Sequence, residues 1–191
     1  MNVHATPQPA NIVNGLDIDG LQTLIERVSA DSATGQTRWR VATAWQGQTH
    51  SRAQVDGFEM GGEAVQRRYV IDIDEPLELG GTDIYANPQE HLLAALNACI
   101  TVGFTALCAL NGVALEQLQI VTEGDIDLRG FFGLDATVAP GYPSLKSTVR
   151  VKGSASEAEF RRIFDMALAT SPNVHNITKP VRLDTTLVVE A

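Results

Sequence analysis

The residues of this chain that could do chemistry lie mostly on one stretch. Its two cysteines are Cys99 and Cys108, and a deprotonated thiol is a strong nucleophile. If the stretch is helical, about two and a half turns separate them, so they face opposite ways and cannot form a disulfide with each other. Glu90 lies a similar number of turns before Cys99. The candidate chemistry is that of one thiol with few polar groups nearby.

Other common chemistries are not indicated. The sequence has no C-x-x-C pair, no glycine-rich phosphate loop, no H-E-x-x-H and no G-x-S-x-G. Its histidines are scattered without the spacing of metal ligands, so we expect no metal and no cofactor. They are His4, His50, His91 and His175. A cysteine on a buried helix is most often an inert core residue, and that interpretation of Cys99 stays open beside the reactive one.

The element that must position Cys99 is a long helix, and capping residues predict both its start and its end. Asn87 is a good N-cap, Pro88 suits the first helical position, and Glu90 can accept from the backbone N–H of the cap. Asn111-Gly112 supplies a left-handed end. Between these ends nearly every face is apolar, which is typical of a buried helix.

We expect this helix to lie in a protein core rather than in a membrane. Asn97, Thr101 and Thr105 interrupt its apolar run. At about 1.5 Å per residue the remaining stretch would barely cross the hydrocarbon layer of a bilayer. The helix is therefore predicted to be too short and too polar to span one.

The rest of the chain predicts a mixed fold. A short amphipathic helix covers Leu21–Val28, and a second helix follows a capping box at Ser154–Glu157 and ends before Pro172. Period-two alternation predicts strands at 38–45, 49–55, 68–74, 118–128, 147–152 and 181–189. Strand runs separated by buried helices predict an α+β fold with antiparallel sheet and helices packed on it.

Composition narrows the function classes. The chain has 191 residues and a formal net charge of −9, which argues against binding to nucleic acid or to an anionic membrane surface. Two cysteines do not make a secreted disulfide framework. The N-terminus lacks the basic and apolar regions of a signal peptide, so we expect a cytoplasmic, reduced protein.

A long segment between two predicted strands, residues 129–143, is rich in glycine and carries Phe131 and Phe132. Loops of this length in compact domains are often functional. An exposed flap without function is the alternative, and the sequence leaves both open.

Two motifs resemble the OsmC/Ohr family. The first runs from Asp74-Glu75-Pro76 through Leu79-Gly80-Gly81 to the helix start, 87–99, and the second is Ser171–Thr178. The resemblance covers roughly Trp39 to the C-terminus. It implies an OsmC-like domain at 36–191, preceded by an N-terminal extension with a short helix at 1–35. It also implies an intertwined homodimer, with antiparallel sheets wrapped around long central helices and sites at the dimer interface.

The resemblance further implies a thiol peroxidase that reduces organic hydroperoxides. In characterised members a helix cysteine attacks the peroxide, and a second cysteine closes a disulfide that dithiols reopen. Cys99 matches the attacking position. An arginine from the N-terminal strands, helped by a glutamate near the helix start, keeps the thiol ionised. Arg52 is the best match for that arginine and Glu90 for the glutamate, with Arg38 and Arg40 as weaker alternatives.

The sequence departs from the family pattern at two positions. The carboxylate often follows Asn-Pro directly, where this chain has Gln89, and Glu90 lies about 100° further around the helix. The position of the second cysteine corresponds to Ser171, which cannot form a disulfide. An external thiol or dithiol would then have to resolve an oxidised Cys99.

The residues and the resemblance together predict two alternative functions. The first is hydroperoxide detoxification by a one-cysteine peroxidase, with Cys99 as nucleophile, Arg52 stabilising the thiolate and Glu90 orienting the arginine. The second is a non-catalytic OsmC-like protein that binds a small apolar ligand or a partner, with Cys99 buried in the core. The enzyme is slightly favoured. The expected apolar substrate pocket consists of Leu96, Phe104, Phe131, Phe132 and Ser171.

Overall fold

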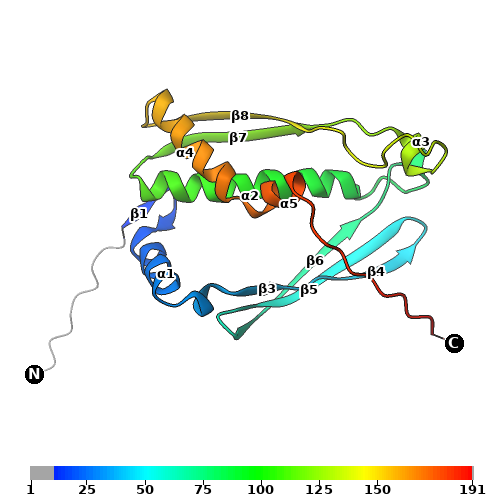
Figure 1. Ribbon diagram of the computed structural model, residues 1–191, viewed down its shortest axis with the longest axis horizontal. Coiled ribbons are helices and arrows are strands. Elements are labelled where there is room, and N and C mark those ends of the chain that lie inside the picture. The colour runs from blue at the N-terminus through cyan, green and yellow to red at the C-terminus, as the bar shows by residue number, and fades with distance from the viewer. Residues whose placement is uncertain (1–10, 191) are drawn as a thin grey trace, which may run out of the picture. The chain divides into compact units, whose positions relative to one another are not determined.

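The computed structural model describes residues 11–190, so His4 and the start of the expected N-terminal extension lie outside the described residues. The chain divides into two compact units, Met1–Ala94 and Ala95–Ala191. Their boundary falls inside the long helix α2, Pro88–Leu110 (Figure 1). The expected boundary between an extension and a domain at residues 35 and 36 stays a prediction.

Unit 1 opens with two short strands and a helix whose N-cap is an aspartate. Two short strands, β1 (Ile12–Val13) and β2 (Leu16–Asp17), pair antiparallel before α1, Ile18–Ala30. The carboxylate of Asp17, the N-cap of α1, accepts from the backbone N–H of Gly20 at 3.1 Å. A 3-10 turn, Ser32–Gly35, follows. The predicted short helix is confirmed, and it is longer at both ends than its apolar pattern alone indicated.

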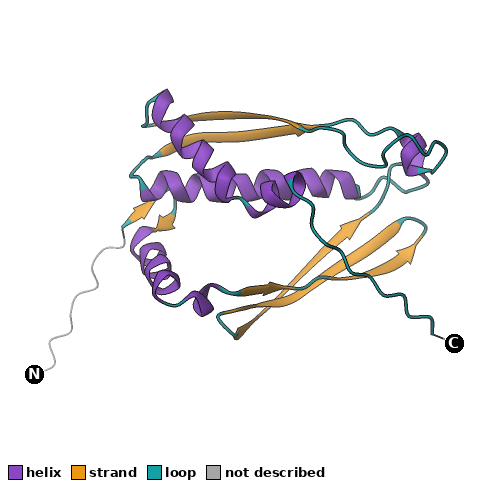
Figure 2. Ribbon diagram, viewed as in Figure 1, coloured by secondary structure: helices purple, strands orange, loops and turns teal. Residues whose placement is uncertain are grey.

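The sheet of unit 1 is built around one long strand. Strand β5 (His50–Met60) pairs antiparallel with β3 (Thr37–Trp39), β4 (Ala42–Gly47) and β6 (Glu63–Ile73). Figure 2 shows these four strands in orange. The predicted hairpin is confirmed, although the first predicted strand is split in two between β3 and β4.

A tight turn at Gly61-Gly62 joins β5 to β6. Both glycines have positive φ, +58° and +82°, and Met60 pairs directly with Glu63. Two consecutive residues with positive φ are what a two-residue hairpin turn of type I′ requires, because its twist matches that of the strands. The glycine pair that interrupts the sequence pattern is therefore the turn of a hairpin.

Helix α2 begins with the capping box that the sequence predicts. Asn87 N donates to Glu90 Oε2 and Glu90 N donates to Asn87 Oδ1, each at 2.8 Å. After Leu110 the chain turns at Gly112, whose φ is +71°. Both ends are confirmed because caps depend on a few neighbouring residues.

One expectation about α2 is wrong. With 23 residues it is long and apolar enough to cross a membrane by length and composition alone. Its three polar residues do not offset the apolar run. The core helix of a soluble protein can be equally long and apolar. Only 28% of its most apolar window is buried within this chain, so much of the apolar surface of α2 is left open here.

Unit 2 packs a hairpin and a helix against α2. Strands β7 (Leu115–Glu123) and β8 (Lys146–Gly153) pair antiparallel and run along α2 (Figure 1). The core joins α2 to α4, Glu157–Thr170, through buried side chains. These are Phe104, Cys108, Val113, Phe160, Ile163 and Ala167. Antiparallel sheet with packed helices confirms the α+β class.

Three details of unit 2 differ from the sequence prediction. Ser156, not Ser154, caps α4 through Glu159 N, while Ser154 Oγ accepts from Ala114 N. Two short helices were not predicted, α3 (Leu128–Phe131) and α5 (Pro172–Thr178). The expected last strand at 181–189 forms no strand in the single chain.

Candidate thiol site around Cys99

Cys99 lies midway along α2 and is half-buried. The Ser171 hydroxyl donates a hydrogen bond to its sulfur, with Oγ 3.2 Å from Sγ. Ser171 is 5% exposed, which is unusual for a serine unless its hydroxyl is hydrogen-bonded. The sulfur of Cys99 is therefore in contact with a fixed polar group rather than surrounded by hydrocarbon alone.

Local structure explains why Ser171 is in this position. It follows the last residue of α4, where Ser171 N donates to Leu168 O at 3.3 Å. It is also the N-cap of α5, where its Oγ accepts from Val174 N at 3.3 Å. Pro172 occupies the first turn of α5, which suits a residue without an N–H. The chain thus ends one helix and begins another at the residue that contacts the thiol.

Further polar contacts hold α2 close to the cysteine. Asn173 Nδ2 donates to Ala95 O at 2.9 Å. On the side of the strands, the Thr122 hydroxyl donates to Asn97 Oδ1 at 2.5 Å and lies 2.6 Å from Ser147 Oγ. The contacts of Asn173 and of Thr122 with α2 lie within four residues of Cys99, so the helix around the thiol is held by polar contacts as well as by apolar packing.

Cys108 has the opposite environment. It is fully buried in the apolar core of unit 2. Burial raises the pKa of its thiol to about 11, and the nearby charge of Glu159 acts in the same direction. A thiol with so high a pKa is almost wholly protonated at neutral pH and is a poor nucleophile. Of the two cysteines, Cys99 is therefore the candidate for chemistry.

The residues expected to form one substrate pocket differ in burial and do not all line the same cavity. Leu96 and Phe104 are buried, and Phe104 lines a groove of about 510 Å³ between β8 and α4. Phe131 and Phe132 lie at α3, 60% and 56% exposed, with their rings 5.0 Å apart. Cys99 and Ser171 do not line that groove or the second cavity described in unit 2, which lies around Leu128 and Val138. A shared pocket at Cys99 stays a prediction.

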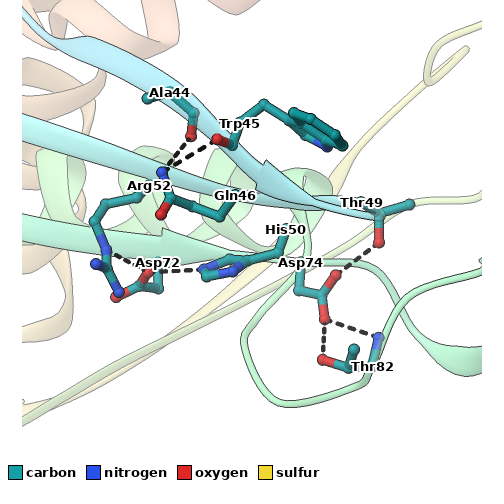
Figure 3. A network of polar contacts seen from close by, with 9 residues as sticks. All are labelled: Ala44, Trp45, Gln46, Thr49, His50, Arg52, Asp72, Asp74 and Thr82. Atoms are coloured by element: carbon teal, nitrogen blue, oxygen red, sulfur yellow. Dashed lines mark hydrogen bonds and ion pairs between the residues drawn. The ribbon is translucent and has the colours of Figure 1, made fainter.

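Arg52 lies in the sheet of unit 1, opposite Asp72 on β6. Its Nε donates to Asp72 Oδ1 at 2.9 Å, and His50 Nε2 lies 2.8 Å from the same oxygen (Figure 3). The hydrogen bond between them raises the pKa of Arg52 and lowers the pKa of Asp72, which His50 lowers further. The ring of His50 stacks on Tyr85 at 5.1 Å. The guanidinium is thus held by a carboxylate within its own sheet.

The other charged candidates have local roles in unit 1. Glu90 accepts from Asn87 N in the capping box, so its contact here is the structural one. Arg38 forms an exposed ion pair with Glu59 at 3.9 Å, and Arg40 lines a shallow pocket beside it. Arg52 and Cys99 belong to different units. The pairing of Arg52 with the thiol, and the role of Glu90 in orienting it, stay predictions.

Sequence reasoning missed the carboxylates on and just after β6. Asp74 is fully buried and accepts from Thr49 Oγ1 at 2.6 Å, from Thr82 N at 2.8 Å and from Thr82 Oγ1 (Figure 3). The hydrogen bonds from Thr49 and Thr82 hold the pKa of Asp74 far below its usual range. Strand alternation places Asp72 and Asp74 on one face, but their partners depend on sheet register and loop folding.

Comparisons with known proteins agree with this fold. The family described as OsmC-like protein matches residues 80–186, more than half of the chain. The chain belongs to the OsmC family. No curated protein matches it by sequence.

Three solved structures illustrate the likeness. An OsmC-like protein from Mycoplasma pneumoniae has a TM-score of 0.57 at 13% identity, over 74% of this chain and 87% of that chain. An OsmC-like protein of unknown function from Vibrio cholerae has a TM-score of 0.52 at 12% identity, over 72% and 92%. The organic hydroperoxide resistance protein OsmC from Legionella pneumophila has a TM-score of 0.46 at 14% identity, over 73% and 89%. The first two show the shared fold.

Proposed function

We propose that this protein is a one-cysteine thiol peroxidase that reduces organic hydroperoxides through Cys99. One observation carries the proposal: Cys99 is half-buried, with a hydroxyl donating to its sulfur at 3.2 Å, whereas Cys108 is sealed in the core. Membership of the OsmC family, whose characterised members the sequence resembles, supplies the reaction class. Because the helix motif resembles that of the family, Cys99 is the proposed attacking residue.

The proposed reaction has three steps. The Cys99 thiolate attacks the outer oxygen of the hydroperoxide, the O–O bond breaks, and the alcohol leaves after taking up a proton. The sulfur is oxidised by two electrons to sulfenic acid. A thiol then condenses with the sulfenic acid, releasing water and leaving a mixed disulfide. A second thiol group attacks that disulfide and regenerates Cys99.

An external reductant is required because the neighbour of Cys99 is Ser171. A hydroxyl cannot displace the sulfenic oxygen to close a disulfide, and Cys108 is buried on another face of α2. A monothiol or a dithiol from solution therefore completes the cycle. This feature separates the proposed mechanism from the two-cysteine cycle implied by the family resemblance.

Arg52 is the proposed stabiliser of the thiolate, and Glu90 the proposed orienter of that arginine. The contacts within unit 1 add Asp72, which holds the guanidinium through Nε. The resemblance also implies a homodimer with sites at the interface, in which Arg52 reaches Cys99 from its own chain or from the partner. A guanidinium near a thiol favours the thiolate, since opposite charges stabilise each other.

The proposed substrates are fatty or aromatic hydroperoxides. Leu96, Phe104, Phe131 and Phe132 are the proposed lining, and the exposure of the last two leaves them available to an apolar ligand. Apolar walls with a few fixed polar groups are the usual composition of small-molecule sites.

A second candidate function is non-catalytic binding of a small apolar ligand. The groove of about 510 Å³ in unit 2 favours it, because Phe104, Phe160 and Phe164 line that groove and Cys99 does not. In this case Cys99 would be a structural residue, and ligand binding would be unaffected by its substitution.

Consumption of cumene hydroperoxide with dithiothreitol or dihydrolipoamide tests the proposal. We expect the wild-type protein to consume the peroxide, Cys99→Ser to fall to the uncatalysed rate, and Cys108→Ala to keep most of the activity. Equal rates for wild type and Cys99→Ser would eliminate the peroxidase and leave the binding function.

A further inference from the structure

The Ser171 hydroxyl has one hydrogen and a limited choice of direction. As N-cap of α5, its oxygen accepts from Val174 N at 3.3 Å. That bond occupies the oxygen on one side, and the hydrogen is directed at Cys99 Sγ, 3.2 Å away. A hydroxyl that accepts from one donor is polarised and becomes a better donor itself. Accepting from Val174 N therefore makes the Ser171 hydroxyl a stronger donor to the sulfur of Cys99.

A second contact ties the same segment to the helix that carries the thiol. Asn173 Nδ2 donates to Ala95 O at 2.9 Å. In a regular α-helix the carbonyl of Ala95 also accepts from the N–H of Cys99, four residues later. The segment Ser171–Asn173 thus contacts the thiol itself and the carbonyl that anchors the backbone of the same cysteine. We call this segment the serine clamp.

We infer that the serine clamp activates Cys99, with Ser171 donating to the thiolate and Asn173 positioning that donor. The inference rests on the proposed function only in treating the thiolate as the reactive form. A hydrogen bond to an anion is stronger than one to a neutral group, so the Ser171 hydroxyl favours the thiolate over the thiol. All of these residues lie in unit 2. The activation is therefore separate from any contribution of Arg52.

The test is the pH dependence of Cys99 alkylation by iodoacetamide, followed at that residue by mass spectrometry of its peptide. Ser171→Ala should move the midpoint of the pH profile upward by about one unit. This shift leaves roughly tenfold less thiolate at a pH below the midpoint. Ser171→Thr, which keeps the hydroxyl, should restore a profile close to wild type.

Two variants separate donation from helix capping. Ser171→Asp keeps an oxygen that caps α5 but replaces the donor with a negative charge, so its midpoint should rise at least as far as that of Ser171→Ala. It also keeps the test usable if Ser171→Ala does not fold. Ser156→Ala removes the equivalent cap at the start of α4, where the Ser156 hydroxyl accepts from Glu159 N, and its midpoint should equal that of wild type.

Asn173→Ala tests the positioning role. It removes the contact with Ala95 O and leaves the hydroxyl, so we expect an upward shift smaller than that of Ser171→Ala. A folded Ser171→Ala or Ser171→Asp with the wild-type midpoint would overturn the inference. A shift in Ser156→Ala as large as that in Ser171→Ala would also overturn it, since the effect would then come from capping.

Failure of this inference and failure of the proposed function can be told apart. A midpoint shift in Ser171→Ala, in a protein that consumes no hydroperoxide, would support the serine clamp and reject the peroxidase. Hydroperoxide consumption that depends on Cys99, with no midpoint shift in Ser171→Ala, would support the peroxidase and reject the clamp.

Discussion

At the scale of single residues, Ser171 combines three roles. It follows the end of α4, caps α5 and donates to the sulfur of Cys99. Where the family resemblance implies a resolving cysteine, this chain has a group of similar size that can hydrogen-bond to the thiol but cannot be oxidised to a disulfide. The difference of one atom changes the expected catalytic cycle from internal to external resolution.

We predict that Ser171→Cys forms a disulfide with Cys99. The two side-chain atoms are 3.2 Å apart, and a disulfide needs about 2.05 Å, a difference that a longer C–S bond and a small side-chain rotation can close. Treatment with diamide should lower the intact mass by two hydrogens and link the two tryptic peptides. The disulfide should leave one free thiol, that of Cys108, and three free thiols in the treated variant would contradict the geometry. Wild type, which lacks the second thiol at this position, is the matched control.

At the scale of elements, polar contacts decide where the helices and loops are fixed. The capping box starts α2, and the carboxylate of Asp74 joins Thr49, at the β4–β5 turn, to Thr82 in the loop before α2. Asp72 holds Arg52 across the β5–β6 pair. These contacts therefore fix the start of α2, a loop before it, and the side chain of Arg52 on β5.

Substitutions of Glu90 separate its capping role from its proposed role in catalysis. Glu90→Ala removes the acceptor of Asn87 N and should destabilise the protein by about 1 kcal/mol in urea unfolding. Glu90→Gln keeps an acceptor oxygen and should keep most of that stability. Because it removes the charge, we expect Glu90→Gln to slow hydroperoxide consumption several-fold. An unchanged rate would leave Glu90 as a helix cap alone.

Asp74 should make the protein sensitive to acid. Its folded-state pKa is lowered by hydrogen bonds from Thr49 and Thr82, so its stabilising effect is present above the unfolded pKa of about 4 and is lost as the pH falls below it. Asp74→Asn should lower the Tm at pH 7 by roughly 5 °C. It should also show a smaller further loss between pH 5 and pH 3. A parallel Tm decrease in wild type and variant would reject this role of Asp74.

The sequence predicted the parts of the structure that depend on neighbouring residues. The caps of α2 and the hairpin of β4 and β5 are examples. Helix α5 was missed because seven residues are too few to show a periodicity, and Pro172 fits both the end of one helix and the start of another. The contacts of Arg52 with Asp72 and of Ser171 with Cys99 join residues far apart in the chain. The motif match to the family pointed to Ser171, while nothing local pointed to Asp72.

At the scale of the whole molecule, the single chain leaves apolar surface uncovered. Val102 on α2 is 69% exposed, and Leu183 and Leu187 are 83% and 87% exposed. The alternating segment 181–189 forms no strand in the single chain, although its pattern is that of one. Large apolar surfaces on a soluble chain usually mark an interface. These features support the homodimer that the family resemblance implies.

We predict a solution mass of about 41 kDa by light scattering, twice the 20.5 kDa of one chain. Removal of residues 180–191 should weaken the dimer, because it deletes the exposed apolar side chains of the C-terminal segment. The charge-changing variant Glu63→Gln, on the exposed start of β6, serves as a control that should keep the mass. A wild-type mass near 20.5 kDa at micromolar concentration would contradict the dimer.

The reaction of Cys99 with hydroperoxides is tested most directly by trapping the oxidised form of this residue. Wild-type protein is treated with one equivalent of cumene hydroperoxide in the presence of dimedone, which reacts with sulfenic acids, and the modified residue is located by mass spectrometry. We predict an adduct on Cys99 that requires the hydroperoxide, and none on Cys108. A Cys99 thiol that stays unmodified and unoxidised in folded protein would contradict it.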